Sequence, residues 1–232
     1  MKIAVSDTGR EEKQKIYLHW LQSFNPNAEL VVASYKNNFD ALDGFDGLVL
    51  TGGEDVDPEL SKATPIESVQ QSDRKRDDFE FRLLDQAMKQ EMPILGICRG
   101  FQVTNVFLGG SLIADLQSAG FQKHNAKKDE QEIRHAIKVN DGTVMQQIIG
   151  TTIGEINSNH HQAALTVADD LMISSYSSDN VIESLEWKEK AGKSFLLLVQ
   201  WHPERMNDNE NPFTKNIGSA FFAEAQKFNS KQ

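Results

Sequence analysis

The hydrophobic positions in the first hundred residues alternate between two patterns. Short apolar runs, which are typical of buried strands, occupy residues 3–5, 30–33 and 47–50 and the stretch just before Cys98. Between these runs, apolar residues recur at helical spacing over residues 16–24 and 79–88. Strands that alternate with helices favour right-handed βαβ units. We therefore predict an α/β fold with a doubly wound, mostly parallel sheet and flanking helices, whose ligand sites lie at the carboxyl ends of the strands.

The second half of the chain has a different pattern. Residues 117–134 are polar and charged, and we expect a solvated surface loop there, with a lid over a substrate as the alternative. Short β-like runs then occupy residues 136–139, 171–176, 181–187 and 195–201. An apolar stripe over residues 213–228 predicts a terminal helix. Extra short strands are thus expected in this half, and because no repeat or linker is visible, we expect residues 1–232 to form one domain.

The composition of this 232-residue chain limits the compartments and the kinds of partner that we expect for it. A formal net charge of −10 makes the phosphate backbone of a nucleic acid an unsuitable partner. A single cysteine excludes an intramolecular disulfide and fits a reducing compartment. No apolar run approaches the ~18 residues of a membrane span, and residues 1–7 predict a strand rather than a signal peptide. We expect a cytoplasmic protein with no membrane or nucleic-acid partner.

The only cysteine, Cys98, lies in the segment GICRG at residues 96–100, between an apolar run and an amphipathic stretch. This pattern is typical of a nucleophile elbow, in which a tight strand-to-helix turn exposes a reactive side chain at the top of a sheet. The turn would also place Cys98 at a helix N-terminus, where the helix dipole favours a thiolate. The alternative is a buried structural cysteine, since free cysteine is among the most buried residue types.

A nucleophilic thiol needs a base and a group that orients the base. His202 follows the apolar run at residues 195–201 directly, which places it at the end of a strand. Pro203 stops the strand, and Glu204 can return to the same side and accept a hydrogen bond from the imidazole. A histidine at a strand end beside a loop proline is the structural alternative. Together with the cysteine elbow, the pattern favours a Cys98–His202–Glu204 triad.

Two further motifs contribute candidate residues. Gly52 and Gly53 follow the strand at residues 47–50, and a turn there would direct a backbone N–H toward the elbow, forming an oxyanion hole with the N–H of Arg99. The adjacent His160 and His161 suggest a metal site at first sight. Zinc would need two more suitable ligands, and the chain has no second cysteine. We therefore expect no metal here and assign the two histidines to a polar wall of the crevice.

The chain resembles the class I glutamine amidotransferase-like hydrolases, and among them the γ-glutamyl-γ-aminobutyrate hydrolase family of the peptidase C26 type. The resemblance is clearest over residues 47–204. It rests on five ordered motifs, namely TGGEDVDP at 51–58, RDDFE at 76–80, GICRGFQ at 96–102, NSNHHQ at 157–162 and VQWHPE at 199–204. It implies a flavodoxin-like fold.

The resemblance also implies roles for individual residues. The family's catalytic cysteine, histidine and glutamate fall on Cys98, His202 and Glu204. Its oxyanion amides fall on Gly53 and Arg99, and Gln102 would help to hold the glutamyl group. We expect the substrate-binding residues to be Gly52, Gln102, His160 and His161.

The expected activity is hydrolysis of the γ-glutamyl amide bond of a small conjugate, such as γ-glutamyl-GABA or a polyamine-derived amide, through a γ-glutamyl thioester that releases glutamate. The chemistry requires no metal or organic cofactor. One alternative is a glutaminase subunit that supplies ammonia to a synthase partner, and another is an inactive binding protein of the same fold. The sequence leaves the oligomeric state open, a homodimer included.

Three acidic residues beside the proposed oxyanion loop suggest a preference for a cationic leaving group. Glu54, Asp55 and Asp57 would attract such a group electrostatically. The alternative is that they cap the loop or accept hydrogen bonds from the backbone.

Overall fold

The computed structural model describes residues 1–37, 39–63, 72–126, 131–208 and 210–231. Within these ranges, one nine-stranded sheet extends through the molecule. Its parallel part consists of β2 (Glu29–Ala33), β1 (Lys2–Ser6), β3 (Gly47–Leu50), β4 (Ile94–Ile97) and β11 (Leu196–Val199), in that spatial order. Its antiparallel part continues with β10 (Ile182–Trp187), β9 (Leu171–Ser177), β6 (Ile133–Val139) and β7 (Ile153–Ser158). A separate pair is formed by β5 (Ser111–Ile113) and β8 (Ala163–Thr166).

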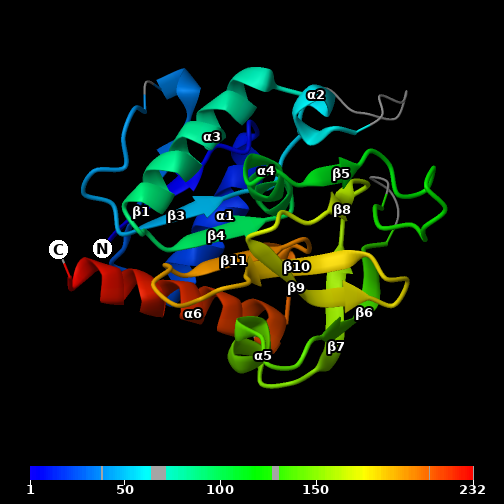
Figure 1. Cartoon of the computed structure of the whole chain (residues 1–232). Helices are drawn as coiled ribbons and strands as arrows, with labels where there is room; N and C mark the ends of the chain where they lie inside the picture. The colour runs from blue at the N-terminus through cyan, green and yellow to red at the C-terminus, as the bar shows by residue number, and fades with distance from the viewer. Residues whose placement is uncertain (38, 64–71, 127–130, 209, 232) are drawn as a thin grey trace.

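Helices cover both faces of the sheet (Figure 1). One face packs against α1 (Glu11–Phe24), α5 (Val144–Ile149) and α6 (Pro212–Asn229). The other packs against α3 (Arg74–Lys89) and α4 (Arg99–Phe107), with the short α2 (Pro58–Ser61) nearby. The strands alternate between the two cores, as β3 shows: Val49 belongs to the first core, whereas Leu48 and Leu50 belong to the second. Burial on both faces explains why the central strands are continuous apolar runs.

The parallel strands also fix the position of the candidate site. Because β3, β4 and β11 are adjacent and parallel, their carboxyl ends meet at one edge of the sheet. Gly52 follows β3, Cys98 follows β4, and His202 follows β11 at the start of the 3₁₀ turn η2 (Pro203–Arg205). The predicted α/β fold with a doubly wound sheet is confirmed. Of the extra strands expected in the second half, β6, β9 and β10 join the same sheet in the antiparallel sense, whereas the run at residues 195–201 forms β11, which is parallel to β4.

The polar tract at residues 117–134 differs from the expectation at its C-terminal end. Ile133 and Arg134 begin β6 and pair with β7. Residues 121–126 are irregular, and residues 127–130 lie outside the described part of the chain. Among the helices described, none combines the length and the hydropathy that a membrane span requires.

Candidate active site

Cys98 occupies a strained turn between β4 and α4. Its backbone has φ 53° and ψ −103°, a left-handed conformation that costs a non-glycine residue about 1–3 kcal/mol. The N–H of Cys98 donates to the carbonyl of Val199 at 2.8 Å, which ties the elbow to β11. A Cβ on Gly100 would lie 2.2 Å from the carbonyl oxygen of Leu50, and one on Gly96 would lie 2.8 Å from the backbone of Gly100. The two glycines are therefore required for the close approach of α4 to the sheet.

His202 and Glu204 form a buried pair beside Cys98. Nδ1 of His202 lies 2.7 Å from Oε1 of Glu204. Burial alone would lower the pKa of His202, but the Glu204 carboxylate and the Cys98 thiolate raise it to about 9. The side chain of Asn157 fixes the backbone of His202 from both sides, accepting from its N–H and donating to its carbonyl, each at 3.0 Å. The ring is thereby held with Nε2 free of partners other than Cys98 among the described residues.

Tyr17 on α1 contacts both the histidine and the loop after β3. Its hydroxyl accepts a hydrogen bond from the N–H of Gly52 at 2.9 Å and lies 3.4 Å from Nδ1 of His202. Burial raises the pKa of Tyr17 well above its usual value, so the phenol stays neutral. A Cβ on Gly52 would come within 2.7 Å of this hydroxyl and 3.2 Å of the His202 ring. Gly52 is therefore packed closely against Tyr17 and His202, and a larger side chain would not fit there. Tyr17 has no signal in the sequence beyond its place on an apolar helix face.

A buried ionic network lies beneath the two proposed oxyanion residues. The guanidinium of Arg99 donates to Glu80 and to Asp77, both on α3. Arg76 donates to Glu80 at 2.9 Å and to the carbonyl of Gly52 at 3.2 Å. Burial opposes the ionisation of Glu80, but the two guanidinium groups hold its pKa below the usual value. The RDDFE motif thus connects the start of α4 with the loop after β3, a role that the sequence could not assign.

The thiol borders a cavity of about 180 Å³ that is also lined by Gly53, Gln102 and His160. Gln102 donates from its amide nitrogen to the carbonyl of Gln162 at 3.1 Å. Lys13 from α1 lines the same cavity, and burial lowers the pKa of its side-chain ammonium. Of the residues expected to bind substrate, Gln102, His160 and His161 line this cavity, whereas Gly52 does not.

The adjacent histidines His160 and His161 have different surroundings. His161 forms ion pairs with Asp55 at 2.8 Å and Asp115 at 3.3 Å, and the hydrogen bond to Asp55 is the main cause that raises its pKa. His160 instead lies beside two further histidines and the carboxylate of Glu183, 3.7 Å from its Nε2. Distant segments thus place further side chains of the metal-ligating type beside His160.

The acidic loop residues are largely engaged within the protein. Asp57 caps α2 by accepting from the N–H of Glu59 at 2.9 Å. Asp55 pairs with His161, and Glu54 lies 3.8 Å from Arg10 in an exposed position. For Asp57, the alternative of a local cap is confirmed.

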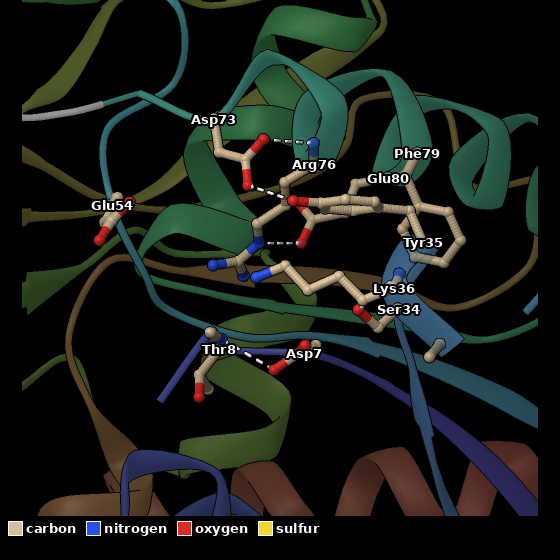
Figure 2. Close-up of a pocket in the computed structure, with 12 residues that line it drawn as sticks. Asp7, Thr8, Ser34, Tyr35, Lys36, Glu54, Asp73, Arg76, Phe79 and Glu80 are labelled. Carbon is tan, nitrogen blue, oxygen red and sulfur yellow. Dashed lines mark hydrogen bonds and ion pairs between the residues drawn. The ribbon is translucent and has the colours of Figure 1, made fainter. Parts of the chain in front are cut away.

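A second, smaller cavity lies beyond the ionic network. Its volume is about 90 Å³. Figure 2 shows it between the ends of β1 and β2 and the first turns of α3. Tyr35 donates to Asp73 at 2.7 Å on one side, and the guanidinium of Arg76 lies on another. Cys98 does not line this cavity, so it is separate from the candidate active site.

An apolar-cored sheet with a cysteine elbow and a His–Glu pair at its carboxyl edge defines a class I glutamine amidotransferase-like fold. The glutaminase domain of CTPS from Trypanosoma brucei has this fold and aligns with a TM-score of 0.66 at 15% identity, covering 98% of this chain and 94% of that one. The model of the peptidase C26 family matches residues 28–204. The chain belongs to this family, which is one of hydrolases.

Curated relatives extend the comparison. The protein NtpR of Enterococcus hirae is 35% identical over 180 residues, which cover 75% of this chain and 73% of NtpR. The γ-glutamyl-γ-aminobutyrate hydrolase PuuD of Escherichia coli K12 is 28% identical over 193 residues, which cover 80% of this chain and 74% of PuuD. These relationships place the chain in the family without fixing its substrate.

Proposed function

We propose that this protein is a cysteine-dependent hydrolase that cleaves the γ-glutamyl amide bond of small conjugates and releases glutamate. The observation that carries the proposal is the convergence of three groups: Cys98 on its left-handed turn, His202 beside it, and Glu204 at 2.7 Å from the imidazole. A thiolate, a proton donor and an orienting carboxylate are the parts that nucleophilic amide hydrolysis needs.

In the proposed mechanism, the Cys98 thiolate forms a bond to the γ-carbonyl carbon of the substrate. The negative charge passes to the carbonyl oxygen, which accepts from the backbone N–H groups of Gly53 and Arg99, and each donor contributes about 3 kcal/mol to lowering the barrier. The C–N bond then breaks while Nε2 of His202 gives its proton to the leaving amine. Water next attacks the thioester carbon while His202 takes up its proton, and the C–S bond then breaks to release glutamate and regenerate the thiolate. Glu204 keeps the imidazole oriented throughout.

Support for a carboxylate-bearing leaving group comes from the charges around the cavity. Lys13 lines it together with Cys98, whereas Asp57 caps a helix and Asp55 pairs with His161. A cationic polyamine would meet Lys13, so we place γ-glutamyl-GABA ahead of γ-glutamyl-putrescine as the substrate. The relation to the E. coli hydrolase named for γ-glutamyl-γ-aminobutyrate is consistent with this order.

The test is glutamate release by the purified protein alone from γ-glutamyl-GABA, γ-glutamyl-putrescine and glutamine, with Cys98→Ala as the control. We expect conjugate hydrolysis well above glutamine hydrolysis, and loss of both in the variant. Turnover of glutamine that rises with a synthase partner would favour a glutaminase subunit instead. Binding of conjugates without any turnover would indicate an inactive binding protein.

A further inference from the structure

Four side chains with no part in the proposed chemical steps converge in the antiparallel half of the molecule, three of them buried and the fourth, His135, partly exposed. They come from separate segments: His124 precedes β6, His135 lies on β6, His160 follows β7, and Glu183 lies on β10. Glu183 is fully buried, and the side chains of His124 and His160 are each only 2% exposed. Oε1 of Glu183 lies 3.3 Å from Nε2 of His135, and 3.7 Å from both Nδ1 of His124 and Nε2 of His160.

The three imidazoles are oriented in a common way. In each ring, the nitrogen that points away from Glu183 faces an oxygen: His124 Nε2 lies 3.1 Å from Asp179, His160 Nδ1 lies 2.9 Å from the carbonyl of Gln162, and His135 Nδ1 lies 3.4 Å from the carbonyl of Ala136. These oxygens accept hydrogen bonds, so each outer nitrogen carries the proton. The inner nitrogens therefore direct lone pairs at Glu183. Metal-binding histidines have the same arrangement, with an outer acceptor that fixes the tautomer.

The cluster has more acceptors than protons to satisfy them. Neither oxygen of Glu183 has a hydrogen-bond partner in the described part of the chain, and the same is true of Nε2 of His135 and His160. Ser158 lies 3.2 Å from Nδ1 of His124, but its hydroxyl donates to the His124 carbonyl at 2.8 Å. One proton on Glu183 could serve a single imidazole. A buried acceptor without a hydrogen-bond partner costs about 1–3 kcal/mol of stability. A single proton on Glu183 would therefore leave most of the acceptors in this cluster unsatisfied.

We propose that His124, His135, His160 and Glu183 form a structural zinc site. Their candidate ligand atoms all lie within 4.8 Å of one another. A tetrahedral zinc ion with bonds of about 2.1 Å separates its ligands by roughly 3.4 Å, close to the three distances measured from Glu183. Three neutral imidazoles and one carboxylate complete a four-coordinate shell, which is the closed arrangement of structural zinc. Cys98 is not a member of this set.

The proposed zinc would stabilise one wall of the cavity beside Cys98. His160 lines that cavity, and its backbone N–H donates to the carbonyl of His124 at 3.0 Å. Its ring shares the carbonyl of Gln162 with the side chain of Gln102. A metal bound to His160 would therefore fix the segment that positions Gln102, without taking part in the reaction.

The direct test uses the full-length, tag-free wild-type protein. After treatment with dipicolinate, the protein is titrated with zinc sulfate in competition with a chromophoric chelator, and metal content is measured after gel filtration. We expect one equivalent of tightly bound zinc, the same stoichiometry in Cys98→Ala, and a higher melting temperature with zinc. Failure of the folded wild-type protein to compete for zinc in the micromolar range would overturn the proposal.

Two variants assign the ligands. We expect Glu183→Gln and His135→Gln each to weaken zinc binding by about 100-fold or more, since even outer partners of metal ligands contribute 10–100-fold. His19→Gln is the matched control and should retain one equivalent. Circular dichroism verifies the fold of each variant. If either variant is unfolded, the visible spectrum of the cobalt-substituted wild type reports the coordination number of the site instead. Retention of one tight equivalent by both folded variants, or a six-coordinate cobalt spectrum, would overturn the proposed site.

Discussion

At the scale of single residues, the site depends on side chains that hold the reacting groups in place. Tyr17 is the clearest case, because one hydroxyl contacts both the loop after β3 and the ring of His202. Asn157 similarly fixes the backbone of His202 through two hydrogen bonds. Neither residue lines the cavity beside Cys98, so each acts by positioning. Their loss should therefore affect kcat more than KM.

Replacing Tyr17 with Phe tests this role. The buried N–H of Gly52 would lose its acceptor, at a cost of about 1–3 kcal/mol, and the loop that carries Gly53 would move to restore a partner. We expect kcat for conjugate hydrolysis to fall about tenfold with KM nearly unchanged. Tyr176→Phe, on the distant strand β9, is the control. An unchanged kcat in Tyr17→Phe would show that the hydroxyl has no positioning role.

Lys13 permits a test of substrate charge. If its ammonium binds a substrate carboxylate, Lys13→Met removes a charge-assisted hydrogen bond and should raise KM for γ-glutamyl-GABA by about tenfold or more with little change in kcat. Lys15→Met is the matched control, because Lys15 lies on the same helix with its side chain 70% exposed. Equal KM values in the two variants would remove the argument for a carboxylate-bearing leaving group.

The Glu204–His202 pair sets the pH dependence. A raised pKa means that the imidazolium is favoured in the folded protein, so its proton is lost only as the pH rises through about 9. We expect kcat/KM to decline there, because the leaving amine loses its proton donor, and the alkaline limb to move to lower pH in Glu204→Gln. The pair should contribute its full stabilisation to the free energy of unfolding below about pH 6.5, and this contribution should be lost as the pH rises through about 9. An alkaline limb that Glu204→Gln leaves in place would contradict this assignment.

At the scale of elements, α3 and α4 are joined by charge as well as by apolar packing. Glu80 accepts from both Arg76 and Arg99 in a site where its side chain is 1% exposed. Arg99 begins α4 immediately after the nucleophile, so the network supports the turn that strains Cys98. The geometry of the elbow thus depends on a helix that contributes no reacting group.

Substitution of Glu80 by Gln should therefore destabilise the fold. The change leaves two buried guanidinium groups with less than their full counter-charge, and removal of one partner from a buried ion pair costs about 3–5 kcal/mol. Urea unfolding measures the loss, with Glu59→Gln as the control because its side chain is 89% exposed. A loss no larger than that of the control would show that the network is not structural.

The sequence predicts the elements of the parallel half well, because strands buried on both faces are continuous apolar runs and their turns require glycine. It predicts the Cys98 elbow and the position of His202 for the same reason. The short helix α5 and the β5–β8 pair have no comparable signal, since a few residues of apolar pattern fit several structures. Nor could the sequence unite His124, His135, His160 and Glu183, because only the long-range pairing of β6, β7, β9 and β10 brings them together.

At the scale of the whole molecule, the two halves of the sheet have separate tasks. The parallel half places the proposed nucleophile and its histidine at one edge, and the antiparallel half encloses the histidine–glutamate cluster. His160 belongs to that cluster and also lines the cavity beside Cys98, so it connects the two. The parallel half thus supplies the reacting groups of the proposed chemistry, and the antiparallel half supplies one wall of the cavity.

In the proposed mechanism, Cys98 carries the glutamyl group during turnover. Intact-protein mass spectrometry tests this step directly. The wild type reacts with a γ-glutamyl anilide, whose activated leaving group favours accumulation of the acyl-enzyme, and the reaction is quenched with acid during turnover. We expect one added glutamyl group, mapped to the peptide that contains Cys98 and absent from Cys98→Ala. Glutamate release by Cys98→Ala at the wild-type rate, or an adduct on any other residue, would contradict it.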